Sequence, residues 1–132
     1  MELRQLARGV EKRTGLSREE SADLSRAVVE GLAAQLSEGE ARHLATDLPD
    51  LLAGDAEASR RRRKGAHPVP VLEFVRQIGS RTGLPESDAR AGTGAVLAEL
   101  SGSLSAANYG HLMGQLPAAY GELAGAGLRS IR

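Results

Sequence analysis

The sequence RTGL stands at residues 13–16 and again at residues 81–84, which lie 68 positions further along the chain. The match continues at this offset without a gap for about 50 residues, as an internal repeat would. Identical pairs recur with it: Ala-Val at 27–28 and 95–96, His-Leu at 43–44 and 111–112, and Leu-Pro at 48–49 and 116–117. A shared bias towards alanine would not preserve this spacing. The sequence therefore predicts an all-α protein made by tandem duplication of a three-to-four-helix unit.

Each unit begins with the pattern of an amphipathic helix. Apolar residues recur at the i, i+3, i+4, i+7 spacing of a helix that buries one face. They are Leu3, Leu6, Ala7 and Val10 in the first unit and Val71, Phe74, Val75 and Ile78 in the second. Gly15 and Gly83 follow at the position where a residue with positive φ would end the helix. We expect these two glycines to be structural.

Start signals for two further helices follow. Ser17 with Glu20 forms a capping-box pattern before a long helix, and Pro85 with acidic neighbours takes that place in the second unit. Ser37 with Glu40 repeats the capping pattern before a short third helix. The apolar residues of this helix are Ala41, Leu44, Ala45 and Leu48, matched in the second unit by Tyr109, Leu112, Met113 and Leu116.

Prolines and a basic segment mark the boundaries. Pro49 and Pro117 restart the chain after the third helix, with a further turn or two of helix expected behind each. Residues 55–70 have no apolar period and end in His-Pro-Val-Pro, which disfavours helix. The predicted organisation is a first unit at 1–54, a linker at 55–70, a second unit at 71–126 and a tail at 127–132. Because units of about 50 residues bury little apolar surface alone, we expect one shared core with pseudo-twofold symmetry.

Charge is balanced over the chain but not along it. Lysine plus arginine and aspartate plus glutamate both number 17, so no net field draws the whole molecule to nucleic acid or to an anionic membrane. Residues 1–54 carry 7 basic and 10 acidic side chains, the linker 5 and 2, and residues 71–132 carry 5 of each. Any electrostatic partner must therefore be recognised by a local surface.

The composition also limits the compartment and the chemistry. The absence of cysteine excludes disulfides, thiolate catalysis and cysteine-bound zinc. No stretch approaches the roughly 20 apolar residues of a membrane span, and the start Met-Glu-Leu-Arg lacks the apolar centre of a secretion signal. We expect a cytoplasmic protein with no membrane partner.

The segment VEKRTGLSREE at residues 10–20, with LSEGEA at 36–41 and Leu-Pro at 48–49, resembles the bacterial DUF2267 family. Both units align with the pattern of this family, which covers nearly everything except the linker and the tail. The resemblance implies a helical bacterial protein of unknown function in the cytoplasm and supplies no catalytic residues. The second unit departs from the pattern at 105–108, where Ser-Ala-Ala-Asn replaces the glycine-glutamate turn.

The strongest local electrostatic feature lies in the linker. It is the run Arg60, Arg61, Arg62, Arg63 and Lys64. Consecutive cations can neutralise several phosphates and bind polyanions without regard to base sequence. The competing interpretations are a solvated linker and docking onto the acidic first unit, and no aromatic residue is interleaved to stack on bases. Association with nucleic acid or another polyanion is therefore the alternative function and not the favoured one.

Two histidines, His43 and His111, hold equivalent positions in the polar stripe of the short helix. In the first unit this stripe contains Glu40, His43 and Asp47, whose spacing places three possible metal ligands on one helix face. Such a row is usually the solvated side of an amphipathic helix, so we predict no metal, with these three residues as the only candidates for one. We expect each histidine to cap a turn or to bond a carbonyl group at the seam between the units.

The sequence contains no nucleophile elbow, phosphate-binding loop or paired-carboxylate cleft. The glycines around Thr93 lie inside a helical pattern, where close helix packing accounts for small residues. We therefore expect no enzymatic activity and no cofactor, with metal-dependent chemistry at the three candidate ligands as the enzymatic alternative. The favoured function is a non-enzymatic helical scaffold or interaction module that binds a protein partner or a second copy of itself.

Overall fold

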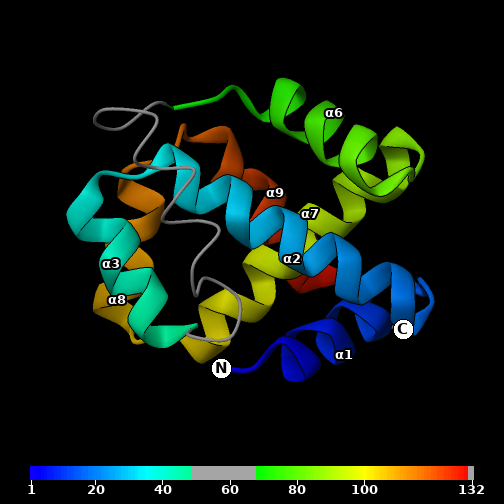
Figure 1. The fold of residues 1–132 in the computed structure, drawn as a ribbon, viewed down its shortest axis with the longest axis horizontal. Helices are drawn as coiled ribbons and strands as arrows, with labels where there is room; N and C mark the ends of the chain where they lie inside the picture. The colour runs from blue at the N-terminus through cyan, green and yellow to red at the C-terminus, as the bar shows by residue number, and fades with distance from the viewer. Residues whose placement is uncertain (49–67, 131–132) are drawn as a thin grey trace.

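The structure is a computed structural model that describes residues 1–48 and 68–130. Within these residues the chain forms seven helices and no strand, which confirms the all-α class (Figure 1). The helices are α1 (Leu3–Thr14), α2 (Arg18–Gln35), α3 (Glu38–Asp47), α6 (Val71–Thr82), α7 (Glu86–Ser103), α8 (Ala106–Gly114) and α9 (Ala119–Arg129). Pro49, the predicted basic run Arg60–Lys64 and most of the predicted linker lie outside the described residues.

We call residues 1–48 the first half of the chain and residues 68–130 the second half. The first helix of each half ends as the sequence predicts. Gly15 and Gly83 follow α1 and α6 with φ of 77° and 76°, a left-handed conformation that favours glycine. Their N–H groups donate to the carbonyl oxygens of Glu11 and Gly79 at 2.9 and 2.8 Å. These bonds satisfy carbonyl groups that the helix end would otherwise leave unpaired.

The predicted start signals of the long helices are also present. The Ser17 hydroxyl accepts a hydrogen bond from the backbone N–H of Glu20 at 3.1 Å, and the Glu20 carboxylate accepts from the N–H of Ser17 at 3.0 Å. This reciprocal pair is a complete capping box at the start of α2. α7 follows Pro85 and has Glu86 and Asp88 in its first turn, where carboxylates favour the positive end of the helix dipole.

The long helices α2 and α7 occupy the centre of a compact bundle (Figure 1). α1 packs against α2 and against α7, while α6 packs against α7 and against α2. α9 lies along α7, and the short helices α3 and α8 pair with each other at one end of the molecule. Helices from both halves of the chain therefore interleave.

One apolar cluster runs through both halves. Its largest buried apolar side chains, with exposures of 1% or less, are Leu6, Leu24, Leu32, Leu36, Leu48, Phe74, Ile78, Leu97 and Leu100. Leu24 of α2 packs on Gly92 of α7, where any Cβ would collide with the leucine methyl groups. Close packing thus accounts for this glycine in a helix interior.

Charged pairs join the same helices at the edge of the core. The guanidinium of Arg13 on α1 donates to the carboxylate of Glu99 on α7 at 2.7 Å. On the opposite side, Arg81 of α6 donates to Glu30 of α2 at 2.8 Å. Each first helix is therefore tied to the long helix of the other half.

A buried ring of hydrogen bonds fixes the start of α6 to the body. The Gln35 amide donates to the Tyr120 hydroxyl at 2.9 Å, and this hydroxyl donates to the carbonyl oxygen of Val69 at 2.7 Å. The N–H of Val69 closes the ring by donating to the Gln35 side-chain oxygen at 2.8 Å. Burial raises the pKa of Tyr120 to about 12, an effect that the Gln35 hydrogen bond opposes and the charge of Glu73 reinforces.

The last helix differs from the sequence prediction. We predicted a turn or two of helix after Pro117 and a tail from residue 127, whereas α9 has 11 residues and continues to Arg129. The reason is tertiary: Gly127 is buried directly against the backbone of Gly94 on α7, so this part of the chain is held in the bundle. No helix in the described part of the chain is long and apolar enough to cross a membrane.

Candidate functional site

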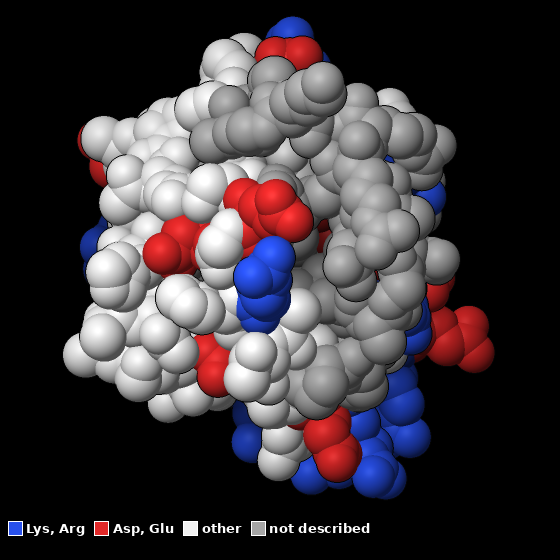
Figure 2. Space-filling model, turned by 60° about the vertical axis from the view of Figure 1, so that its left-hand side comes forward, with Lys and Arg blue, Asp and Glu red and all other residues white. Residues whose placement is uncertain are grey.

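The end of the molecule formed by α3 and α8 has two sides that differ in charge. Figure 2 shows it from outside: acidic and basic side chains stand near the centre, and a broad area without charge extends to the left. Residues 101–121, which include all of α8, contain no Asp, Glu, Lys or Arg, and we call their exposed part the uncharged surface. The residues 68 positions earlier in the sequence, 33–53, carry charge at Glu38, Glu40, Arg42, Asp47 and Asp50.

Four glycines lie on the uncharged surface with free space where a side chain would begin. A Cβ added at any of them would meet no atom within 4 Å; they are Gly102, Gly110, Gly114 and Gly121. Sequence reasoning missed this surface, although the signal was present as a run of 21 residues (101 to 121) without a charged side chain in a chain that is 26% charged.

Polar side chains join α3 and α8 along a line that we call the α3/α8 seam. At one end, the Gln115 side-chain oxygen accepts from the N–H of Ser37 at 2.9 Å, and the Gln115 amide donates to the Ser37 hydroxyl at 3.1 Å. Ser37 caps α3 through the N–H of Glu40, as predicted. The Glu40 carboxylate does not accept a hydrogen bond from the N–H of Ser37, because this N–H donates to the Gln115 side-chain oxygen instead.

The other end of the seam joins Asp47 to α8. The Asn108 amide donates to the Asp47 carboxylate at 2.9 Å. The amino group of Met1 donates to the backbone oxygen of Asp47 at 2.8 Å, which brings the start of the chain to the end of α3. Asp47 is therefore a structural hydrogen-bond partner of the second half.

Glu40 lies between two histidines in the middle of the seam. Its Oε1 atom is 3.9 Å from Nδ1 of His43 on α3 and 3.9 Å from Nδ1 of His111 on α8. The Glu40 side chain is only 17% exposed, whereas both imidazoles are 63% exposed. Both distances exceed hydrogen-bond length, so an exposed histidine from each half faces one largely buried carboxylate.

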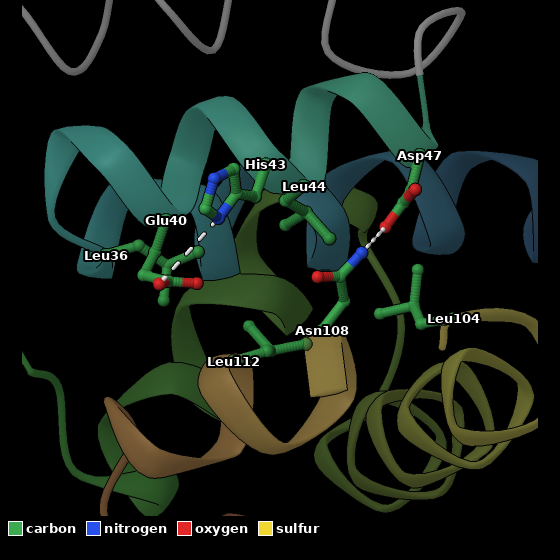
Figure 3. A pocket seen from close by; sticks show the side chains of 8 residues that line it. All are labelled: Leu36, Glu40, His43, Leu44, Asp47, Leu104, Asn108 and Leu112. Atoms are coloured by element: carbon green, nitrogen blue, oxygen red, sulfur yellow. Dashed lines mark hydrogen bonds and ion pairs between the residues drawn. The ribbon is translucent and has the colours of Figure 1, made fainter. Parts of the chain in front are cut away.

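A small pocket opens at the seam (Figure 3). Its apolar walls come from both halves, and Glu40 and Asp47 stand at opposite ends of it. The leucines that line it are Leu36, Leu44, Leu104 and Leu112. The empty space measures about 210 Å³ with open solvent included. The part of this space that a water-sized molecule can enter measures only about 10 Å³, the room of about one water, which is far below the roughly 300–1,000 Å³ of small-molecule sites.

The predicted metal candidates separate into different contacts. Glu40 faces the two histidines, while Asp47 bonds Asn108. In residues 1–48 and 68–130, no three histidine or carboxylate side chains are grouped so that they could hold a metal ion. Both imidazoles lie near the Glu40 carboxylate, which sequence spacing could not bring to His111, and the predicted turn cap or carbonyl bond of each histidine stays a prediction.

The remaining predicted residues have structural places or lie outside the structure. Gly15 and Gly83 end helices, and Pro117 lies between α8 and α9, where its carbonyl oxygen accepts from the N–H of Tyr120 at 3.1 Å. Tyr109, on α8, is half-buried, and this burial raises its pKa. The polyanion candidates Arg60–Lys64 are outside the described residues, so the structure does not place them at this site.

Comparison with known proteins gives one match. The model of the family described as "Uncharacterized conserved protein (DUF2267)" matches residues 4–123. No curated protein and no solved structure matches the chain. The matched range contains α2, α3, α6, α7 and α8 in full and most of α1, and it includes the side chains that form the seam.

Proposed function

Since this chain belongs to the DUF2267 family, whose description assigns no activity, we propose its function from its own surfaces: a non-enzymatic module that binds a protein partner. The observation that carries the proposal is the uncharged surface of residues 101–121. The cysteine-free composition supports action in the cytoplasm.

Charge depletion is the first argument. The centres of protein–protein interfaces are depleted of charged residues, because every charge buried there must lose its water. The first half carries charge on α3 at Glu38, Glu40, Arg42 and Asp47, whereas α8 has none among Asp, Glu, Lys and Arg. Exposure to water alone does not explain why α8 has no charged side chain, because the solvent-facing side of a surface helix usually carries charged residues.

The open glycines are the second argument. Glycine within a helix costs about 1 kcal/mol relative to alanine. Gly92 and Gly94 have an internal reason, since a Cβ there would collide with neighbouring atoms. Gly110, in the middle of α8, has no such reason within the described residues. A partner that packs closely on the backbone of α8 would supply one.

The test introduces a single charge on this surface. Gly110→Arg creates at α8 the residue that the first half has at Arg42, and its Cβ meets no atom within 4 Å. The control is Gly39→Arg, equally open but on α3. We expect wild type and Gly39→Arg to capture the same protein from the source cells, and Gly110→Arg to lose it. Equal capture by all three proteins would refute the uncharged surface as the interface.

We also infer that the two halves are copies of one unit, packed about an approximate twofold axis. The bounds of α1 and α6 differ by 68 residues, as do those of α2 and α7. The hydroxyls of Thr14 and Thr82 both donate to the carbonyl four residues earlier at 2.7 Å. The crossed ion pairs of Arg13 and Arg81 support the same relation.

Polyanion binding is the second candidate function, because the linker run Arg60–Lys64 places five cations in succession. Exposed cations on one face of α1, at Arg4, Arg8 and Lys12, could add to it. The test is a titration of labelled duplex DNA at low salt with wild type and with residues 60–64 changed to serine. Equal affinity of the two proteins would end this candidate.

A further inference from the structure

The helix α1 is the most basic element in the described part of the chain. It contains Arg4, Arg8, Lys12 and Arg13 against Glu11 alone, a net charge of plus three. The helices α2, α3 and α7 each have two more acidic than basic side chains. α6 has one more basic than acidic, α9 has one of each, and α8 has neither. Because the whole chain is neutral, α1 forms a local positive region.

Three of these cations form a row on the outer face of α1. Arg4, Arg8 and Lys12 are all exposed, and each follows the last by four residues, which places them on one side of the helix. The rise of 1.5 Å per residue separates neighbours by about 6 Å and spreads the row over about 12 Å. Figure 2 shows basic side chains gathered along the lower edge of the molecule, on the side where α1 lies in Figure 1.

The cations of this row are not taken up by other side chains. Arg8 and Lys12 form no ion pair with any residue that the structure describes. Arg4 is 4.0 Å from Glu2, and because their side chains are 82% and 66% exposed this pair contributes little. Arg13, by contrast, is 15% exposed and bound to Glu99. The row can therefore meet an anion from outside while Arg13 holds the fold.

We propose that the row Arg4, Arg8 and Lys12 binds the phosphate backbone of a duplex nucleic acid. Duplex DNA carries one negative charge for about every 1.7 Å of its axis, so three cations spread over about 12 Å can meet phosphates together. Contacts to phosphate carry no information about base sequence, so the binding is independent of sequence. The inference goes beyond the proposed functions, because this surface depends on neither the linker run nor the uncharged surface.

The structure favours a duplex over the two other common polyanions. A helix that binds an anionic membrane inserts its apolar face, but this face of α1 is buried in the core at Leu6 and Val10, both 0% exposed. Proteins that bind single strands stack bases on aromatic side chains. None lies on α1, and Phe74 and Tyr120 are buried elsewhere in the bundle. A double-stranded backbone requires neither insertion nor stacking.

The experiment uses the full-length protein with residues 60–64 changed to serine, so that the linker run does not contribute. Labelled duplex DNA is titrated at several salt concentrations from about 50 mM upwards. We expect binding at low salt, with a slope of log affinity against log salt of about −3 for three phosphate contacts. The combined substitutions Arg4→Gln, Arg8→Gln and Lys12→Gln should weaken binding at least about tenfold and remove most of this slope.

The matched control removes the same charge from other helices. Arg26→Gln, Arg76→Gln and Arg90→Gln together change three exposed cations on α2, α6 and α7, and this protein should keep most of its affinity. Circular dichroism checks that both triple variants remain folded. Should the α1 variant melt early, Arg8→Glu at the middle of the row gives a smaller change with the same expected loss of binding.

Three results would overturn the inference. The first is no binding of duplex by the serine-linker protein at low salt. The second is equal weakening by the two triple variants, which would mean that overall charge and not the α1 row attracts the DNA. The third is tighter binding of single-stranded DNA or of phosphatidylglycerol vesicles than of duplex. The linker is tested by wild type against the serine-linker protein, and the uncharged surface by Gly110→Arg, so each proposal can fail separately.

Discussion

At the scale of single residues, Tyr120 connects three parts of the chain through one hydroxyl. It accepts from Gln35 on α2 and donates to the carbonyl of Val69 before α6, while its own ring belongs to α9. The ring also meets Phe74 edge-on at a centroid distance of 5.6 Å. An ionised hydroxyl could not donate to Val69, so the fold favours the protonated form.

We therefore predict that the folded protein loses stability at alkaline pH because Tyr120 ionises. Its pKa is raised to about 12 in the folded protein, chiefly by burial, against an ordinary value of 10.0. The preference for the protonated form stabilises the fold fully below about pH 10 and is lost as the pH rises towards about 12. Urea unfolding across this range should show wild type losing stability.

Tyr120→Phe provides the comparison. Without the hydroxyl, the variant should be less stable at about pH 9 by about 1–3 kcal/mol and should lose less as the pH rises. Background titration in this range is limited, because the chain has lysine only at positions 12 and 64 and one other tyrosine, Tyr109. Parallel pH curves for the two proteins would show that Tyr120 does not couple ionisation to folding.

At the scale of elements, the packing of α9 on α7 depends on the absence of side chains at two points. A Cβ on Gly94 would stand 2.7 Å from the backbone oxygen of Leu123, and a Cβ on Gly127 would collide with the Gly94 carbonyl. Backbone atoms cannot move away as a flexible side chain can. The helices must therefore separate if either glycine acquires a side chain.

Gly94→Ala should destabilise the protein by about 1–3 kcal/mol in urea unfolding, because α9 must move away from α7. Gly102→Ala is the control on the same helix, since a Cβ there meets no atom within 4 Å. It should leave stability unchanged or raise it by up to about 1 kcal/mol. Equal effects of the two substitutions would mean that helix propensity, and not the close approach of α9, governs Gly94.

The helix bounds also show what local sequence can predict. Gly15 and Gly83 end helices, and the capping box of Ser17 starts one, because these signals act within a few residues. Ser37 carries a similar signal, but its partner Gln115 is 78 residues away, so only half of the predicted box forms. The extension of α9 to Arg129 likewise depends on a contact with Gly94 that no local pattern contains.

The candidate site was harder to predict than the fold for the same reason. The sequence placed Glu40, His43 and Asp47 on one helix face and thus offered them as metal ligands. In the structure, His111 of α8 lies near Glu40, and Asn108 of α8 donates a hydrogen bond to Asp47. Because of these contacts, Glu40 and Asp47 have separate partners and do not act as one set of possible metal ligands. The 68-residue offset predicts which positions correspond, but it does not predict which side chains of α3 and α8 contact each other across the seam.

At the scale of the whole molecule, the two halves depend on each other because the first helix of each half packs against the long helices of both. α1 packs on α7 and α6 packs on α2, and the pairs Arg13–Glu99 and Arg81–Glu30 join the same helices. The core cluster contains buried residues from both halves. Each half alone would expose an apolar face to water that the other half now covers.

Fragments of the chain should therefore fold only together. A peptide of residues 1–54 offers about 50 residues, too few to bury a sufficient core, and we expect it to be largely unfolded by circular dichroism. Mixing it with residues 70–132 should restore helicity with a concentration-dependent midpoint, because folding is then an association. Arg13→Ala in the first fragment should weaken this association by removing the bond to Glu99 and the bond to the carbonyl of Gly127 at 2.8 Å. Cooperative melting of either fragment by itself would contradict a shared core and make each half an independent domain.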